Sequence, residues 1–173
     1  IYSKKTPMAS YLKNKKLVKD GESLWDIIKR IEIPRQWTPD LMAYCQQKGI
    51  IFLSTPFDLN AVDELEAAGV EAYKVASFEI THLPMLKKIS ATGKPIILST
   101  GMASLEDIEI ALAAIRSGGI SEVALLHCAI AYPPKFEDIN LRAMDTMHQA
   151  FGLPVGFSDH TMGHVTDVAA VAR

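Results

Sequence analysis

The sequence has little cysteine, no long apolar run and no excess of charge of one sign. Its 173 residues include only Cys45 and Cys128, which are single and far apart, so we expect neither a disulfide framework nor a paired-thiol metal site. No apolar run approaches the roughly 20 residues of a membrane span. The net charge of −2 offers no basic footprint for nucleic acid. These absences predict no nucleic-acid partner, no membrane partner and a cytoplasmic location.

Two nucleotide-binding signatures are also missing, the Gly-rich dinucleotide fingerprint and the P-loop. What is present, 49% hydrophobic and 22% charged residues, excludes a disordered chain and is ample for one core. The chain begins at Ile1 rather than Met and stops at Arg173 in an apolar-rich stretch without a helix-stop residue. We therefore expect it to be part of a larger protein.

Five short runs rich in Ile, Val and Leu have the length and composition of β-strands. Most of them carry apolar residues at both odd and even positions, which is typical of parallel strands buried on both faces. The runs are 50–54, 72–76, 95–99, 123–128 and 154–158.

Stretches with helical spacing lie between these runs. Leu105, Ile108, Leu112 and Ile115 are three or four residues apart, so they share one helix face. Ser104 with Asp107 predicts a capping box for that helix, and Ser23 with Asp26 predicts another. Glycines at 49, 69, 93 and 118 follow helical runs, where a left-handed helix end is expected. Alternating strands and helices predict an α/β fold with a parallel sheet.

Two architectures fit this alternation, a (β/α)8 TIM barrel and an open doubly wound sheet. The missing dinucleotide fingerprint weakens the second, and five strands are too few for a closed barrel. Both architectures therefore stay open for the organised part of the chain, residues 22–173, since the chain ends suggest that further units are missing. Residues 1–21 are rich in lysine with little periodicity, and we interpret them as a solvated loop or a flap that attracts anions over an active site.

Polar side chains follow every one of the five predicted strands. In a barrel the carboxyl ends of the strands form the rim where chemistry occurs, although Ser and Thr are also common there as helix caps. The side chains are Ser54 and Thr55, Lys74 and Ser77, Ser99 and Thr100, His127 and Cys128 with Tyr132 beyond, and Ser158, Asp159 and His160.

Lys74 and His160 are the sharpest candidates on this rim. Lys74 lies inside a strand that should be buried, where an ammonium needs an anionic partner. It is either half of a structural ion pair, a ligand for phosphate or carboxylate, or a Schiff-base amine. His160 directly follows a strand, where an imidazole can bind a divalent metal, act as a base or be structural.

Four motifs together resemble the sialic acid synthases, the family of N-acetylneuraminate, legionaminate and pseudaminate synthases. The motifs are Phe-Leu-Ser-Thr-Pro-Phe-Asp at 52–58, Ala-Tyr-Lys-Val-Ala-Ser at 72–77, Gly-Lys-Pro-Ile-Ile-Leu-Ser-Thr-Gly-Met at 93–102 and Gly-Phe-Ser-Asp-His-Thr at 156–161. The resemblance implies a (β/α)8 barrel of which this chain holds about the third to seventh strands. It also implies a transferase of carbohydrate biosynthesis. The implied reaction condenses phosphoenolpyruvate with an N-acetylated amino sugar, N-acetylmannosamine or a related deoxy amino sugar. The products are a nine-carbon sialic-type sugar acid and phosphate.

The resemblance also implies roles for individual residues. His160 corresponds to one of two metal-binding histidines, with Mn²⁺ or Mg²⁺ as the cofactor, and Tyr132 to an aromatic residue on the sugar side. A homodimer is implied for the full-length protein. The residues implied to surround phosphoenolpyruvate are Thr55, Lys74, Ser77, Ser99 and Ser158.

One departure leaves the sugar substrate open. Ile130 stands where the family usually has a polar residue, and this removes a contact to phosphoenolpyruvate or to the sugar. Two other functions stay possible at this stage, a barrel aldolase that uses Lys74 as a Schiff base, and a non-catalytic degenerate barrel. Because family strands with further site residues are absent from this chain, we expect the 173 residues alone to be inactive.

Overall fold

The computed structural model describes the backbone of residues 8–13, 16–120 and 122–173, and the side chains of these residues from Trp25 onward. The chain packs as two compact units, Ile1–Asp40 and Leu41–Arg173. No helix among the described residues is both long enough and apolar enough to cross a membrane.

The N-terminal unit contains an antiparallel hairpin and a helix. Strands β1 (Met8–Lys13) and β2 (Lys16–Ser23) pair with Tyr11 opposite Val18 and Leu12 opposite Leu17. A loop was expected here, but the two segments pair as a hairpin, in which Tyr11 and Val18 are residues that favour extended backbone. The anion-attracting flap stays a prediction. Helix α1 (Leu24–Ile31) forms where the Ser23 signal predicts a helix; the cap itself lies outside the described side chains. A 3₁₀ turn, η1 (Arg35–Trp37), precedes helix α2 (Thr38–Lys48).

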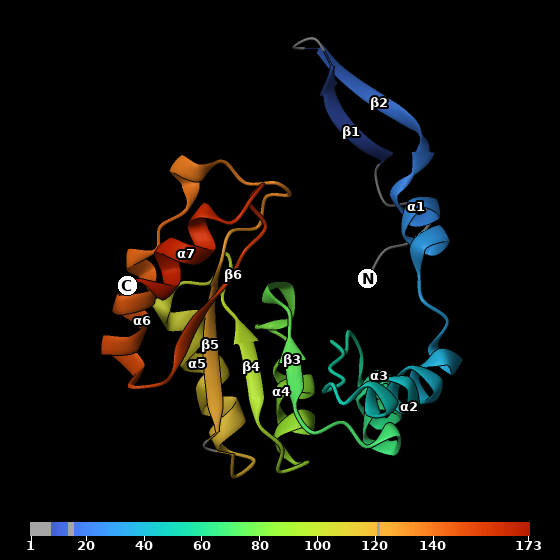
Figure 1. Ribbon diagram of the computed structural model, residues 1–173, viewed down its shortest axis with the longest axis vertical. Coiled ribbons are helices and arrows are strands. Elements are labelled where there is room, and N and C mark those ends of the chain that lie inside the picture. Colours follow the sequence, from blue (N-terminus) through green and yellow to red (C-terminus); the bar gives the residue numbers. More distant parts are fainter. Residues whose placement is uncertain (1–7, 14–15, 121) are drawn as a thin grey trace. The chain divides into compact units, whose positions relative to one another are not determined.

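The second unit is an α/β domain around a parallel sheet (Figure 1). Its strands β3 (Tyr73–Val75), β4 (Ile96–Ser99), β5 (Val123–Cys128) and β6 (Val155–Ser158) lie in the order β3-β4-β5-β6. A helix follows each strand. These helices are α4 (Leu83–Ser90) after β3, α5 (Leu105–Arg116) after β4, α6 (Arg142–Phe151) after β5 and α7 (Val165–Val171) after β6. Four of the five predicted strands and the parallel sheet are confirmed.

The fifth prediction, a strand at 50–54, is wrong. These residues are irregular, and Ile50, Ile51 and Leu53 are exposed to 58%, 69% and 41%. A run with strand composition becomes a strand only when a neighbour pairs with it, and no described segment pairs with this one. Helix α3 (Leu59–Ala68) follows, capped by the Asp58 side chain and ended by Gly69 at φ 82°.

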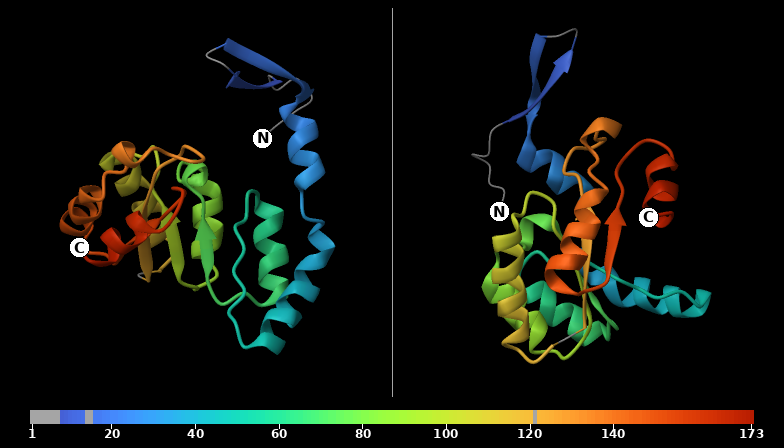
Figure 2. Two further views of the ribbon diagram at one scale, coloured as in Figure 1. Left: turned by 45° about the horizontal axis from the view of Figure 1, so that its top comes forward. Right: turned by 90° about the vertical axis from the view of Figure 1, so that its left-hand side faces the viewer.

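The two faces of the sheet have different surroundings. Tyr73, Val75, Leu98 and Leu125 are fully buried in a core shared with helices α3 to α6, and Figure 2 shows α4 and α5 on one side of the sheet. Residues of the other parity are mostly half-buried. We call this side the Lys74 face; the pairing register places on it Lys74, Ile97, Ser99, Ala124, Leu126, Cys128, Gly156 and Ser158.

The helix ends largely follow the sequence signals. Ser104 and Asp107 form the predicted capping box, and Gly49, Gly69 and Gly93 have positive φ. Gly118 does not adopt the predicted left-handed conformation; Gly119 does, at φ 94°. Gly118 is instead required for close packing, because an added Cβ would lie 2.7 Å from the Ser90 Cβ.

Candidate active site at the carboxyl ends of the strands

The parallel sheet brings the polar strand ends to one edge. Lys74 lies in one row of the sheet, Ser99 in the next, and Cys128 and Ser158 are paired in the row after that. All four residues belong to the Lys74 face, because partners in a parallel ladder point to the same side.

Lys74 is held by a neighbouring strand. Its Nζ donates to Ser99 Oγ at 2.7 Å and to the Val75 carbonyl at 3.3 Å. Burial lowers the pKa of the Lys74 ammonium, and the nearby Cys128 and Glu79 oppose this shift in part. No carboxylate among the described residues lies within ion-pair distance of Nζ, so none of them forms the structural ion pair that the sequence allows. The ammonium retains donor capacity for an anionic ligand.

The Ser77 hydroxyl is a second donor group, and it lies in the 3₁₀ turn η2 (Ser77–Glu79). Ser77 Oγ accepts a hydrogen bond from the Gly101 amide at 3.0 Å, which leaves the hydroxyl hydrogen to donate elsewhere. Gly101 has no room for a side chain, because an added Cβ would lie 2.8 Å from Ile130 Cγ2 and 2.9 Å from Ser77 Oγ. Ile130 therefore forms an apolar wall against the Ser77–Gly101 contact.

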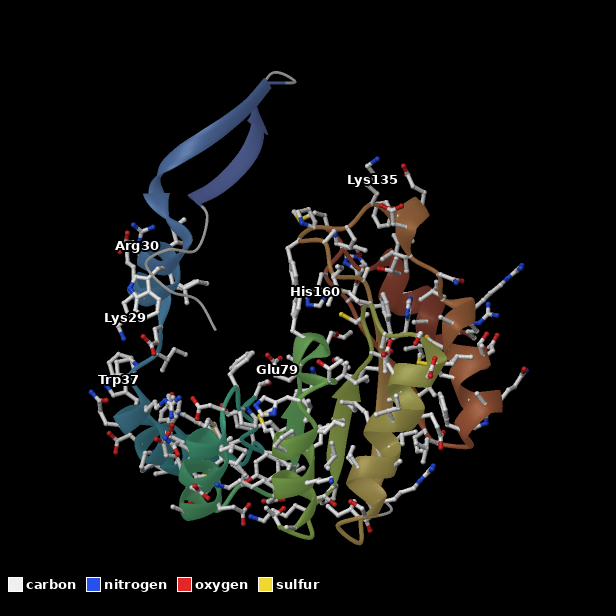
Figure 3. The ribbon with its side chains drawn as sticks, turned by 180° about the vertical axis from the view of Figure 1, so that it is seen from behind. Lys29, Arg30, Trp37, Glu79, Lys135 and His160 are labelled. Carbon is white, nitrogen blue, oxygen red and sulfur yellow. The ribbon has the colours of Figure 1, made fainter. Side chains whose placement is uncertain are left out.

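Glu79 is a site candidate that the sequence interpretation missed. Its side chain is buried, with 5% of its surface exposed, and no described residue forms a hydrogen bond with its Oε2. Burial raises the pKa of this carboxyl, while its own backbone amide, His82 and Lys74 act in the opposite direction. The available signal was a carboxylate two residues beyond Ser77, in a turn that follows a buried strand. Figure 3 shows Glu79 and His160 toward the same end of the sheet.

His160 is bounded by two side chains from the β5 end. Its Nδ1 lies 3.8 Å from Cys128 Sγ, and its ring packs edge-on against Tyr132 with centroids 4.5 Å apart. Asp159 accepts hydrogen bonds from the Thr161 amide, the Thr161 hydroxyl and the Thr166 hydroxyl at 2.6–2.9 Å. The Asp159 carboxylate therefore orders the loop that carries His160.

A metal ion would obtain one ligand from these residues. The imidazole stands at the rim, and no hydrogen bond among the described residues engages its Nε2. This fits one position of a divalent metal site. The part of the chain that the structure describes holds no group of three or more His, Cys, Asp or Glu suited to a metal, so further ligands would have to come from substrate, water or other chain segments.

The predicted site residues fall into separate groups. Lys74 bonds to Ser99, Ser77 bonds to the loop after Ser99, and Tyr132 contacts His160. Thr55 is half-buried in the irregular segment 51–57 and makes no described hydrogen bond to any of these residues. Ser158 pairs with Cys128 through the sheet.

His127 lies on the opposite face, stacked on Phe157 with ring centroids 5.7 Å apart. The His127 ring therefore packs against the neighbouring strand on the side of the sheet away from Lys74.

The fold and this rim define a class: a parallel α/β domain with a cationic, hydroxyl-lined edge suited to a small anion. A family model described as the NeuB family matches residues 1–173. The chain belongs to the NeuB family, which confirms the resemblance to the sialic acid synthases.

Several curated relatives cover most of this chain. N,N'-diacetyllegionaminic acid synthase of Campylobacter jejuni is 43% identical over 159 residues, which is 91% of this chain and 48% of that protein. Pseudaminic acid synthase of Helicobacter pylori is 35% identical over 151 residues, 87% of this chain and 44% of that protein. The chain thus spans about half the length of the curated relatives it matches.

Solved structures give the same picture. N-acetylneuraminic acid synthetase of Leptospira borgpetersenii, in complex with citrate, has a TM-score of 0.81 at 34% identity over 88% of this chain and 54% of that one. The spore coat polysaccharide biosynthesis protein of Bacillus subtilis has a TM-score of 0.78 at 35% identity over 88% and 43% of the two chains. A phospho-2-dehydro-3-deoxyheptonate aldolase of Thermotoga maritima shares the fold at TM-score 0.64 and 14% identity.

Proposed function

We propose that this chain is the central part of an enzyme that condenses phosphoenolpyruvate with an N-acetylated amino sugar. The observation that carries this proposal is the half-buried Lys74 ammonium, bonded to Ser99 and without a carboxylate partner among the described residues. A cation held by a hydroxyl at a strand-end rim is suited to a small anion with phosphate and carboxylate groups. The relatives named as legionaminic, pseudaminic and N-acetylneuraminic acid synthases support the same reaction class.

We infer that the complete fold is a (β/α)8 barrel, to which this chain contributes about the third to seventh strands. Two observations support this: the chain covers only about half of its relatives, and 50–54 has strand composition but no described partner. Residues 22–173 would then belong to the barrel, and residues 1–21 would form a Lys-rich loop or flap. The full-length protein would be a cytoplasmic homodimer.

The residues of the rim position the anion in this proposal. Lys74 and Ser99, with Ser77, Thr55 and Ser158, hold phosphoenolpyruvate so that its methylene carbon faces the sugar aldehyde. A C–C bond forms there, water adds to the enol carbon, and the C–O bond to phosphate breaks as phosphate leaves. The Lys74 ammonium offsets the negative charge of the substrate without giving up its proton.

On the sugar side, Tyr132 and Ile130 form the walls. Ile130 presents an apolar surface, with 41% exposed, which favours a deoxygenated substituent over a hydroxyl at that point. His160 would hold a divalent ion, Mn²⁺ or Mg²⁺. When bound, such an ion would supply a Lewis acid for the aldehyde oxygen.

The proposal is tested by phosphoenolpyruvate binding to the full-length protein, measured by titration calorimetry. We expect Lys74→Ala to weaken binding by roughly 10-fold to 100-fold, the worth of a hydrogen bond to a charged group. Lys87→Ala is the matched control, because Lys87 is an exposed lysine of helix α4. Unchanged binding in Lys74→Ala would overturn the assignment, and no binding by the wild type would favour a non-catalytic barrel.

A second candidate is a barrel aldolase with Lys74 as the Schiff-base amine. The observation in its favour is the lowered pKa of Lys74, because a neutral amine is the nucleophile. Borohydride trapping of a carbonyl substrate on Lys74 would favour this candidate. Activity that a chelator abolishes would oppose it.

A further inference from the structure

The Cys128 thiol links the His160 ring to the backbone of the β5 end. Cys128 Sγ donates to the Ala129 carbonyl at 3.4 Å and lies 3.8 Å from His160 Nδ1. A thiol carries a single hydrogen, so a sulfur that donates to Ala129 presents only lone pairs to the imidazole. The tautomer that suits this arrangement carries its hydrogen on Nδ1, directed at sulfur, and has its lone pair on Nε2.

Tyr132 restrains the same ring from a second direction. Its ring meets the imidazole at an interplanar angle of 72°, an edge-to-face contact between aromatic groups. The Cys128 contact limits rotation of the imidazole in its plane, and the Tyr132 contact limits its tilt. Cys128 is buried, with 8% exposed, so the thiol is a fixed partner.

We propose that Cys128 and Tyr132 are positioning residues that hold His160 as the Nδ1–H tautomer and direct Nε2 toward a divalent cation. The inference rests on the metal role of His160 in the proposed function. A ligating histidine commonly donates its other ring N–H to a neighbouring acceptor, which fixes the tautomer and the ring orientation. Here the acceptor is a sulfur atom on the adjacent strand.

The separation of Sγ and Nδ1 also allows a competing arrangement. An ion bound by both atoms at a tetrahedral angle, roughly 2.3 Å from sulfur and 2.0 Å from nitrogen, would place them about 3.5 Å apart. The thiol hydrogen bond to Ala129 and the burial of Cys128 favour the positioning role. The two arrangements differ in a direct observable, a bond between sulfur and the metal.

The test uses Mn²⁺ as the probe in the full-length protein, with affinity measured by electron paramagnetic resonance. We expect Cys128→Ala to weaken Mn²⁺ binding about 10-fold or more, as loss of such a partner does elsewhere. Cys128→Ser should retain part of the affinity, Tyr132→Ala should lose affinity, and Tyr132→Phe should match the wild type. In ring-labelled protein without metal, nitrogen NMR should show His160 as the Nδ1–H form, and a tautomer mixture in Cys128→Ala.

His160→Ala separates this inference from the proposed function. If it leaves Mn²⁺ binding unchanged, the metal assignment itself fails and the inference fails with it. If it abolishes binding while Cys128→Ala stays within about twofold of wild type, only the positioning role is wrong. An intense sulfur-to-metal charge-transfer band with Co²⁺ would also overturn it. Should Cys128→Ala not fold, the Tyr132→Ala and Tyr132→Phe pair decides.

Discussion

Gly118 shows how a single residue can be fixed by its neighbour rather than by its backbone angles. The Ser90 hydroxyl donates to the Ile115 carbonyl at the end of helix α5, and Gly118 donates its amide to the same carbonyl at 3.0 Å. The Ser90 side chain occupies the space into which a side chain at position 118 would extend. Helices α4 and α5 are therefore joined at their carboxyl ends by a contact that only glycine permits.

We expect Gly118→Ala to destabilise the fold by about 2–3 kcal/mol, in the range of overpacked cores. The new Cβ would lie 2.7 Å from the Ser90 Cβ, and closer still to its hydroxyl. Gly163→Ala is the comparison, because Gly163 has φ 97° but nothing within 4 Å of an added Cβ, so it should lose only about 1 kcal/mol. Urea unfolding measures both; equal losses would contradict the packing argument.

His127 predicts a pH dependence of stability. Burial lowers the pKa of this imidazole, so the unfolded chain binds a proton more readily than the folded one. The stabilisation is complete above the unfolded pKa of about 6.5 and declines as the pH falls below it toward the folded pKa.

The measurement is the free energy of unfolding in urea at pH 8 and at pH 5.5. His127→Phe keeps an aromatic ring to stack on Phe157 and should lose less stability between the two pH values than the wild type does. His164→Phe, at an exposed position, should behave like the wild type. An identical pH dependence in His127→Phe and the wild type would show that this imidazole does not titrate on unfolding.

At the scale of elements, strand β3 is anchored to helix α3 by a buried phenol. The Tyr73 hydroxyl lies 2.7 Å from Glu66 Oε1 and 3.2 Å from the Val62 carbonyl, and Lys94 Nζ reaches the same Glu66 oxygen at 2.7 Å. Burial and Glu66 raise the pKa of Tyr73 well above its usual range. The strand that carries Lys74 is thus tied at its neighbouring position.

We expect Tyr73→Phe to lower the free energy of unfolding by about 1 kcal/mol, the net worth of one hydrogen bond. The Tyr44→Phe variant serves as its control, since Tyr44 is 57% exposed and its ring remains available to Lys48. Thermal or urea unfolding of the two variants gives the comparison. If Tyr73→Phe is as stable as the wild type, the Tyr73 hydroxyl does not anchor strand β3 to helix α3.

Elements with a strong apolar pattern were predictable from the sequence wherever the fold supplied a partner for that pattern. Strands β3 to β6 follow from their Ile, Val and Leu runs, and helix α5 from its spacing and its capping box. The segment 50–54 was not, because strand formation depends on a partner that composition does not reveal. The hairpin in the first 23 residues was missed because its apolar pairs are short and surrounded by lysines.

In the candidate site, too, some residues were predictable from the sequence and some contacts were not. Lys74, Ser77, Ser99 and His160 were identifiable because a polar residue in or after a buried strand is conspicuous. The Cys128–His160 contact joins residues 32 apart in sequence, and neither spacing nor composition predicts which side chain a histidine will meet. That no described residue forms a hydrogen bond with Glu79 Oε2 is a result of how the η2 turn packs, and only the folded chain defines this packing.

At the scale of the whole molecule, the reaction proposed above needs more than the rim of this chain supplies. The described residues provide Lys74 and His160, but no cluster of three potential metal ligands. We therefore expect the 173-residue chain, expressed alone, to release no phosphate from phosphoenolpyruvate in the presence of an N-acetylated amino sugar and Mn²⁺. A phosphate assay measures this, with the full-length protein as the positive control. Measurable release by the isolated chain would contradict the expectation.

His127 and Cys128 are consecutive residues that serve opposite sides of one sheet. Deleting or inserting a single residue within β5 would exchange them, because side chains alternate with a period of two. The thiol would then face the apolar core, and the imidazole would lie on the Lys74 face. A change in the length of β5 would therefore disturb the core and the candidate site at the same time, whereas a substitution disturbs only one side of the sheet.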